Sequence, residues 1–144
     1  MRDSQLQAGS REFCWPIQVY YEDTDAAGVV YHSNYLKFME RARTEWLRSE
    51  GFSQQSLAEG EGIVFVVAKI NIEFIRPALF DELLNVRSKI TGTNGAGLMF
   101  EQSVISESGT VKCRADVHIV CVDSKTFRPK RIPNSIKAKL TYDS

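Results

Sequence analysis

Residues 34–48, NYLKFMERARTEWLR, are the stretch that decides the fold. Its apolar side chains recur at intervals of three and four residues, the spacing of one broad apolar face on an α-helix. Gly51 follows at a position typical of a helix end. The apolar positions are Tyr35, Leu36, Phe38, Met39, Ala42, Trp46 and Leu47. The sequence therefore predicts a long helix that buries one side against the rest of the chain.

Runs rich in β-branched and aromatic residues lie on both sides of this helix, one before it and four after it. The expected strands are Ile17–Tyr21, Ile63–Phe74, Leu83–Thr93, Leu98–Ser106 and Val111–Val122. Asn94-Gly95 is a hairpin signal between two of them, and a short helix over Pro133–Leu140 is expected at the end. One long helix and a run of antiparallel strands predict an α+β fold in which the sheet wraps around a largely buried helix.

Composition narrows the class of protein. A chain of 144 residues suits one domain, expected over residues 14–144 after a flexible polar tail over residues 1–13. Eighteen basic and eighteen acidic side chains give zero net charge, and no basic run suggests a nucleic-acid surface. Three cysteines without a CxxC pair argue against a disulfide framework or a metal site. With no secretory signal and no membrane-span-length apolar stretch, a cytoplasmic protein is expected.

The segment before the long helix concentrates chemically active residues: YEDTDAAGVVYHSNY, residues 21–35. Gly28 allows a turn, and Ser33 or Asn34 is expected to cap the helix. An acid, Asp25, would then lie near exposed helix amides, which stabilise a negative charge that develops in front of them. This arrangement suits attack by Asp25, or by water that it activates, on a carbonyl carbon. The segment therefore indicates acyl transfer or hydrolysis.

Each of these residues also has a structural interpretation. Asp25 could be a turn residue that accepts local amide hydrogen bonds, and Asp23 is interpreted as the partner of a capping amide or an arginine. His32 could be a helix-terminal side chain, and Tyr21 either a core residue or a pocket residue that bonds Asp25. Glu40, close to arginines on the helix, is more typical of an ion pair than of a catalytic acid.

The chain resembles the hotdog-fold acyl-CoA thioesterases of the 4-hydroxybenzoyl-CoA thioesterase family, and most closely those associated with the Tol-Pal system. The resemblance covers about residues 16–133. It rests on Tyr21-Glu22-Asp23-Thr24-Asp25, Gly28-Val29-Val30-Tyr31-His32, Asn34-Tyr35-Leu36, Met39-Glu40-Arg41-Ala42-Arg43 and Phe74-Ile75-Arg76-Pro77-Ala78. It implies a curved antiparallel sheet around a central helix, dimers whose sheets join edge to edge, often a homotetramer, and active sites built by two chains.

The resemblance also implies site residues. Asp25 would be the catalytic carboxylate, and amides around Tyr31 and His32 would polarise the thioester carbonyl. His32 would orient water or the thioester. A histidine at this position also argues against 4-hydroxybenzoyl-CoA as the substrate, because family members that act on that substrate do not carry it. Catalytic residues are thus expected at Asp25 and His32, and substrate-binding residues at Tyr21, Gly28, Val29, Tyr31, Phe38, Val66 and Arg76. Phe38, Met39, Val66 and Val67 would form an apolar wall for the acyl chain. Candidates to bind the phosphates of coenzyme A are Arg76, Arg128, Lys130 and Arg131, and the alternative for each is a solvated surface charge.

The expected function is hydrolysis of short- to medium-chain acyl-CoA to a free acid and coenzyme A, without metal or redox cofactor. Two alternatives stay open. A hotdog dehydratase acting on hydroxyacyl thioesters would use His32 with an acid from a partner chain. A non-catalytic module would bind acyl-CoA or an acyl carrier protein without turnover.

Overall fold

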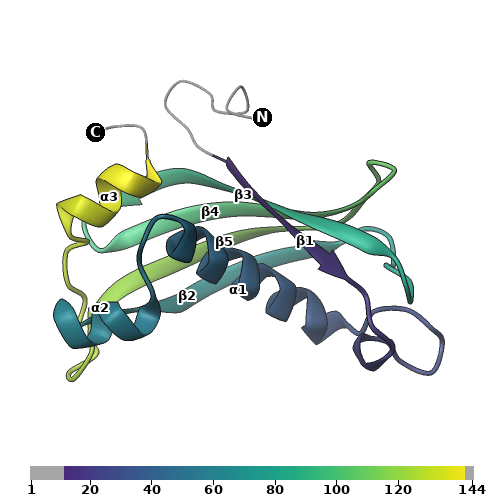
Figure 1. Cartoon of the computed structure of the whole chain (residues 1–144), viewed down its shortest axis with the longest axis horizontal. Helices are drawn as coiled ribbons and strands as arrows, with labels where there is room; N and C mark the ends of the chain where they lie inside the picture. Colours follow the sequence, from purple (N-terminus) through teal and green to yellow (C-terminus); the bar gives the residue numbers. More distant parts are fainter. Residues whose placement is uncertain (1–11, 142–144) are drawn as a thin grey trace.

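The computed structural model describes residues 12–141, which form an antiparallel five-stranded sheet with helices packed on it (Figure 1). The elements are β1 (Glu12–Gln18), the 3-10 helix η2 (Tyr21–Asp23), α1 (His32–Ser49), α2 (Gln54–Gly60), β2 (Ile63–Phe74), β3 (Leu83–Asn94), β4 (Gly97–Ser106), β5 (Val111–Asp123) and α3 (Asn134–Leu140). The strand order is β1-β3-β4-β5-β2, so the two edges are β1 and β2. The α+β fold predicted from the sequence is confirmed.

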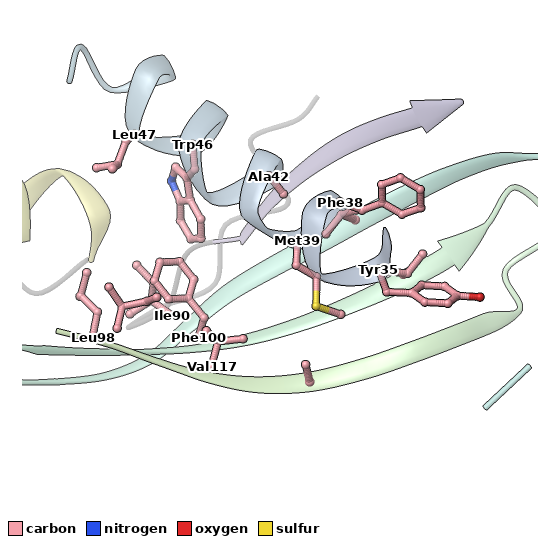
Figure 2. Close-up of a cluster of buried hydrophobic side chains, with 14 of the residues drawn as sticks. Tyr35, Phe38, Met39, Ala42, Trp46, Leu47, Ile90, Leu98, Phe100 and Val117 are labelled. Atoms are coloured by element: carbon pink, nitrogen blue, oxygen red, sulfur yellow. The ribbon is translucent and has the colours of Figure 1, made fainter. Parts of the chain in front are cut away.

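The core lies between α1 and the sheet. Met39 and Trp46 point from the helix toward the strands, where the Trp46 ring meets the Phe100 ring edge-on at 5.9 Å (Figure 2). Met39 is fully buried, and Phe38 is 1% exposed. The apolar face predicted from the three-and-four spacing is therefore the face that packs, except that Leu36 is 38% exposed. Burial of this face supplies most of the driving force that holds α1 in place.

A polar network crosses this core. The side-chain oxygen of Gln102 accepts a hydrogen bond from Nη1 of Arg43 at 2.8 Å. The Gln102 amide nitrogen donates to the Met39 carbonyl at 3.1 Å and to the Ser88 hydroxyl at 2.9 Å. Burial lowers the pKa of Arg43, partly offset by the negative charge of Glu40. The network ties the middle of α1 to β3 and β4.

The N-terminal boundary differs from the predicted one. Strand β1 begins at Glu12, and the Phe13 ring stacks on Trp46 at 5.7 Å, so the domain includes these residues as well. Residues 1–11 of the predicted tail lie outside the described residues. The strand expected to reach Tyr21 ends at Gln18, because the chain turns there into η2.

The start of α1 also corrects the prediction. Tyr31 is the N-cap, and His32 is already helical. Neither Ser33 nor Asn34 caps the helix, because both lie inside it. The side-chain amide of Asn34 instead donates to the Asp23 carbonyl at 2.9 Å. Helix α2 was not predicted because its segment is polar and buries only Leu57. Ser53 caps it instead, accepting a hydrogen bond from the Ser56 amide.

Strand β2 is a long edge strand. Eleven of its twelve residues pair with β5 along one side, with a bulge between Val67 and Lys69. Val66 and Val67 on this strand are 36% and 46% exposed. A long apolar edge strand presents unpaired backbone groups that readily pair with another chain.

Candidate active site

The site is built on the loop between β1 and α1, at the end of the sheet opposite α2 (Figure 1). The Asp25 amide donates to the Val29 carbonyl at 2.9 Å, and the Gly28 amide donates to the Asp25 carbonyl at 3.0 Å. Gly28 has φ +82°, a conformation that favours glycine and closes this tight turn. Asp25 is therefore held on a defined turn.

The Asp25 carboxylate is exposed, and only one of its oxygens is used locally. Oδ1 accepts the Ala27 amide at 2.9 Å and the Val29 amide at 3.5 Å. Within residues 12–141 nothing donates to Oδ2. Asp25 is thus a turn residue, and it also offers one carboxylate oxygen to solvent or substrate.

Asp23 has the structural role that was predicted for it. Its Oδ2 accepts the Tyr20 amide at 2.9 Å, and its carbonyl accepts the Tyr31 amide at 3.0 Å. The second bond occupies one amide that the resemblance had assigned to the thioester carbonyl. The amides of His32 and Ser33, the first of α1, have no intrahelical acceptor and remain available there.

A small cavity of about 170 Å³ adjoins the helix start. His32, Val29 and Arg76, all predicted site residues, line it together with Val30, Tyr35, Phe74, Ile75 and Pro77. The imidazole of His32 lies over the Phe74 ring, with 4.5 Å between centroids. His32 is exposed, and in the described part of the chain its ring has no hydrogen-bond partner. This geometry leaves the imidazole free to meet a ligand.

A larger cavity of about 440 Å³ lies between α1 and the sheet beside the β2 edge. Val66 and Val67 line it, as predicted for the acyl wall, together with side chains from β4, β5 and the end of α3. Lys37, Glu40 and Arg43 contribute the charged part of the lining. Glu40 lies about two helical turns beyond His32, the first residue of α1, and is therefore remote from the Asp25 turn along the helix.

Other predicted residues lie elsewhere. Phe38 and Met39 are packed in the core, so the wall expected of them is provided by neighbouring residues of α1 and β2. The Tyr21 ring is 79% exposed and packs edge-on against Phe80, with no hydrogen bond to Asp25 in the described chain. Tyr31 is also exposed, and its ring lies beside His32.

The predicted phosphate-binding residues divide between the two ends of the sheet. Arg76 lies at the small cavity. Arg128, Lys130 and Arg131 are exposed on the turn after β5, at the far end of the sheet (Figure 1). In a single chain these three therefore cannot meet the same ligand as Asp25.

Two site residues escaped the sequence analysis. Phe74 contacts both His32 and Tyr35, and the Tyr35 hydroxyl accepts the buried Ala78 amide at 3.0 Å. Burial raises the pKa of Tyr35, an effect that the Ala78 hydrogen bond partly offsets. The signal for Phe74 was the segment Phe74-Ile75-Arg76-Pro77-Ala78, from which only Arg76 was assigned a role. The signal for Tyr35 was the segment Asn34-Tyr35-Leu36, where Tyr35 was assigned only to the apolar face of the helix.

No cluster of three or more His, Cys, Asp or Glu side chains in residues 12–141 is arranged to hold a metal ion. In the same residues, no helix has the length and apolar character needed to cross a membrane.

The fold and the site together define a hotdog-type protein with an acid and a helix N-terminus at one end of a wrapped sheet. The family model of the thioesterase-like superfamily matches residues 19–140. The acyl-CoA thioester hydrolase YbgC of Escherichia coli O6:H1 is 46% identical over 127 residues, covering 88% of this chain and 94% of that protein.

Solved structures agree. A probable thioesterase from Bartonella henselae superposes with TM-score 0.81 at 38% identity, covering 85% of this chain and all of that one. A 1,4-dihydroxy-2-naphthoyl-CoA thioesterase from Synechocystis superposes with TM-score 0.84 at 27% identity, covering 90% and 96%. The chain therefore belongs to the thioesterase-like superfamily of hotdog-fold acyl-CoA thioesterases.

Proposed function

We propose that Asp25 is the catalytic carboxylate and that the amides of His32 and Ser33 bind the oxyanion. The chain is an acyl-CoA thioester hydrolase by its family and its relatives. The observation that carries the assignment is the free Oδ2 of Asp25 on a turn that ends at the start of α1. Fixed donors at a helix start stabilise an oxyanion without reorganisation.

In the general-base route, Asp25 takes a proton from water while the water oxygen bonds to the thioester carbon. The carbonyl oxygen becomes an oxyanion held by the helix amides, and its collapse breaks the carbon–sulfur bond. In the nucleophilic route, an Asp25 oxygen bonds to that carbon instead and forms a mixed anhydride, which water then hydrolyses. In both routes coenzyme A leaves as a thiolate. Because a thiol has a pKa of roughly 8.5, the thiolate is a good leaving group and no acid catalyst is needed to protonate it.

His32 has a supporting role in this proposal. Its ring lies on Phe74 at the small cavity, where it can orient the water or the thioester. Loss of His32 should therefore reduce the rate less than loss of Asp25.

We propose that a second copy of the chain completes the site. The free edge of β2 can pair with the β2 edge of another copy around a two-fold axis, and such pairing is antiparallel. Glu40 and Arg43 lie one turn apart on the cavity-lining face of α1, and no carboxylate in the described chain forms an ion pair with Arg43. If the two-fold axis passes beside this face of α1, Glu40 of each copy would lie toward Arg43 of the other.

Antiparallel pairing also supports coenzyme A as the carrier. The Ile63 end of β2 lies beside the basic turn, because Ile63 pairs with Asp123. In a dimer, this end of one copy lies beside the Phe74 end of the other. The basic turn that carries Arg128 and Lys130 would then reach the Asp25 site of the second copy, where it can bind phosphates. An acyl carrier protein is the competing carrier.

The acyl group would lie in the groove between α1 and β2, closed by the second copy. A largely apolar cavity of about 440 Å³ suits a short to medium chain. Hydrolysis of a thioester involves no change of oxidation state, so it needs no redox cofactor. We propose that no metal takes part either, because Asp25 supplies the base or nucleophile and the helix amides supply the oxyanion donors. Activity after exhaustive chelation should equal that of untreated enzyme.

The cellular setting is also a proposal. Cys14, Cys113 and Cys121 are free thiols, which supports a reducing cytoplasmic compartment. The association with the Tol-Pal system and the assembly of two dimers into a homotetramer stay predictions, the latter testable by sedimentation velocity.

The test is a panel of acyl-CoAs with short, medium, long and aromatic acyl groups, assayed for free thiol and for enoyl product. Thiol release that is fastest on short and medium chains supports the proposal. An enoyl product from a hydroxyacyl-CoA would support the dehydratase instead. Tight binding without turnover on every member would support the binding module.

A further inference from the structure

The connection between β2 and β3, residues 75–82, is held by one lysine of β5. The Lys112 carbonyl accepts the amides of Ile75 and Arg76 at 2.9 and 3.0 Å. The Lys112 ammonium donates to the Pro77 carbonyl at 3.3 Å. Lys112 thus binds the beginning of the connection through both its backbone and its side chain.

Glu82 binds the other end of the connection. Its Oε2 lies 3.3 Å from the Lys112 ammonium, and its Oε1 accepts the Leu79 amide at 2.9 Å. The two side chains are only 11% and 26% exposed. A sheltered ion pair recovers little net free energy after desolvation, so stability alone is a weak explanation for it. Hydrogen bonds at both of its ends point to a geometric role.

The Asp25 loop is attached to this same connection. The Val30 amide donates to the Ala78 carbonyl at 2.8 Å, and the Phe80 amide donates to the Gly28 carbonyl at 3.3 Å. Val29 forms a β-bridge with Leu79, and the Val29 carbonyl accepts the Asp25 amide. The position of Asp25 therefore depends on residues 78–80, which the Glu82 and Lys112 side chains hold in place.

We propose that Glu82 and Lys112 are positioning residues for thioester hydrolysis: the pair fixes the β2–β3 connection and thereby sets Asp25 against the first amides of α1. The inference rests on the proposed role of Asp25. A misplacement of about 1 Å between reacting groups can cost about a hundredfold in rate, so weakening the pair should reduce kcat even in a folded enzyme.

The test uses two variants of different severity. Lys112→Met keeps the apolar stem and removes both ammonium contacts. Glu82→Gln keeps an oxygen acceptor for the Leu79 amide and removes the charge that faces Lys112. The matched control is Glu45→Gln, which removes an ion pair with Arg48 that is remote from the loop.

For Lys112→Met we expect kcat to fall about ten- to a hundredfold, with KM changed less than about threefold. The kcat of Glu82→Gln should fall less than that of Lys112→Met. The kcat of Lys112→Arg should lie between those of Lys112→Met and the wild type, because a guanidinium can donate to both the Pro77 carbonyl and the Glu82 carboxylate. Hydrogen exchange of the Asp25 and Val30 amides should accelerate in Lys112→Met and stay unchanged in Glu45→Gln. A purely stabilising pair would lower the melting temperature without this local change.

Unchanged kcat in folded Lys112→Met, or unchanged exchange at Asp25 and Val30, would overturn the positioning role. If Lys112→Met does not fold, the same two readouts on Glu82→Gln decide. If the wild-type enzyme releases no thiol, the proposed function fails, and the exchange measurement alone then judges whether the pair holds the loop.

Discussion

Replacing Gln102 by Met should destabilise the fold strongly, because Gln102 is the centre of the buried polar network. The variant keeps the apolar stem but loses the hydrogen bonds to Arg43, Met39 and Ser88. The bond to the guanidinium is worth about 1.5–3 kcal/mol and the two neutral bonds about 1 kcal/mol each, while the added apolar burial returns about 1 kcal/mol. The expected loss is therefore about 2.5–4 kcal/mol.

Dividing this loss of unfolding free energy by the unfolding entropy gives the expected shift of the melting temperature. An unfolding entropy of about 2.1 cal/mol/K per residue gives about 0.3 kcal/mol/K for 144 residues, so the midpoint should fall by about 8–13 °C. Calorimetry at one fixed protein concentration measures it, since assembly also contributes to stability. Glu101→Gln, an exposed neighbour on β4, is the control and should shift the midpoint by less than about 2 °C.

The double variant Arg43→Met/Gln102→Met tests the cause. Removing both partners abolishes the unpaired buried charge, so the double variant should be more stable than the sum of the two single losses predicts. A shift below about 2 °C for Gln102→Met, or strict additivity in the cycle, would refute the reasoning that Arg43 depends on Gln102.

Three further predictions concern thiols, pH and assembly. Burial raises the pKa of Cys113 to about 12, so a maleimide at pH 8 should label exposed Cys14 quickly and Cys113 only on unfolding, as read by mass spectrometry. Hydrogen bonds from backbone amides, of which the Thr126 amide has the largest effect, lower the pKa of Asp123 below its ordinary value of 3.8. The stability that the Asp123 carboxylate gives the turn is therefore present above pH 3.8 and is lost as the pH falls through the lower pKa of the folded state. An NMR titration of Asp123 with a midpoint at or above 3.8 would contradict this. Val67→Asp places a charge on the exposed β2 edge and should convert the assembly to monomers in sedimentation velocity, with loss of activity; an unchanged assembly would rule out β2 as the interface.

The sequence was informative wherever the local pattern sets the structure. The run from Ile63 to Phe74 is β-branched and aromatic, and the strand has those bounds. The three-and-four spacing identified the buried face of α1. Helix α2 escaped because its single buried side chain, Leu57, gives no periodic signal.

For the candidate site too, the residues within one local segment could be predicted and their surroundings could not. Asp25 and His32 could be singled out because one short segment carries both the turn and the helix start. Their surroundings come from distant segments: Phe74 beside His32, and the Glu82–Lys112 pair beneath the loop. Such contacts depend on the register of β2, β3 and β5, which no local pattern specifies. Helical spacing likewise predicted that Phe38 faces inward, without telling a packed position from a cavity wall.

The central claim is that Asp25 carries the chemistry, and the most direct measurement is kcat for Asp25→Asn beside Asp23→Asn on the best acyl-CoA of the panel. Asn keeps an oxygen that can accept the local amides at either position, so both variants should fold. We predict that Asp25→Asn loses about 10²- to 10⁴-fold in kcat, whereas Asp23→Asn stays within about tenfold of the wild type. An Asp25→Asn enzyme within about threefold of the wild-type kcat would contradict the account.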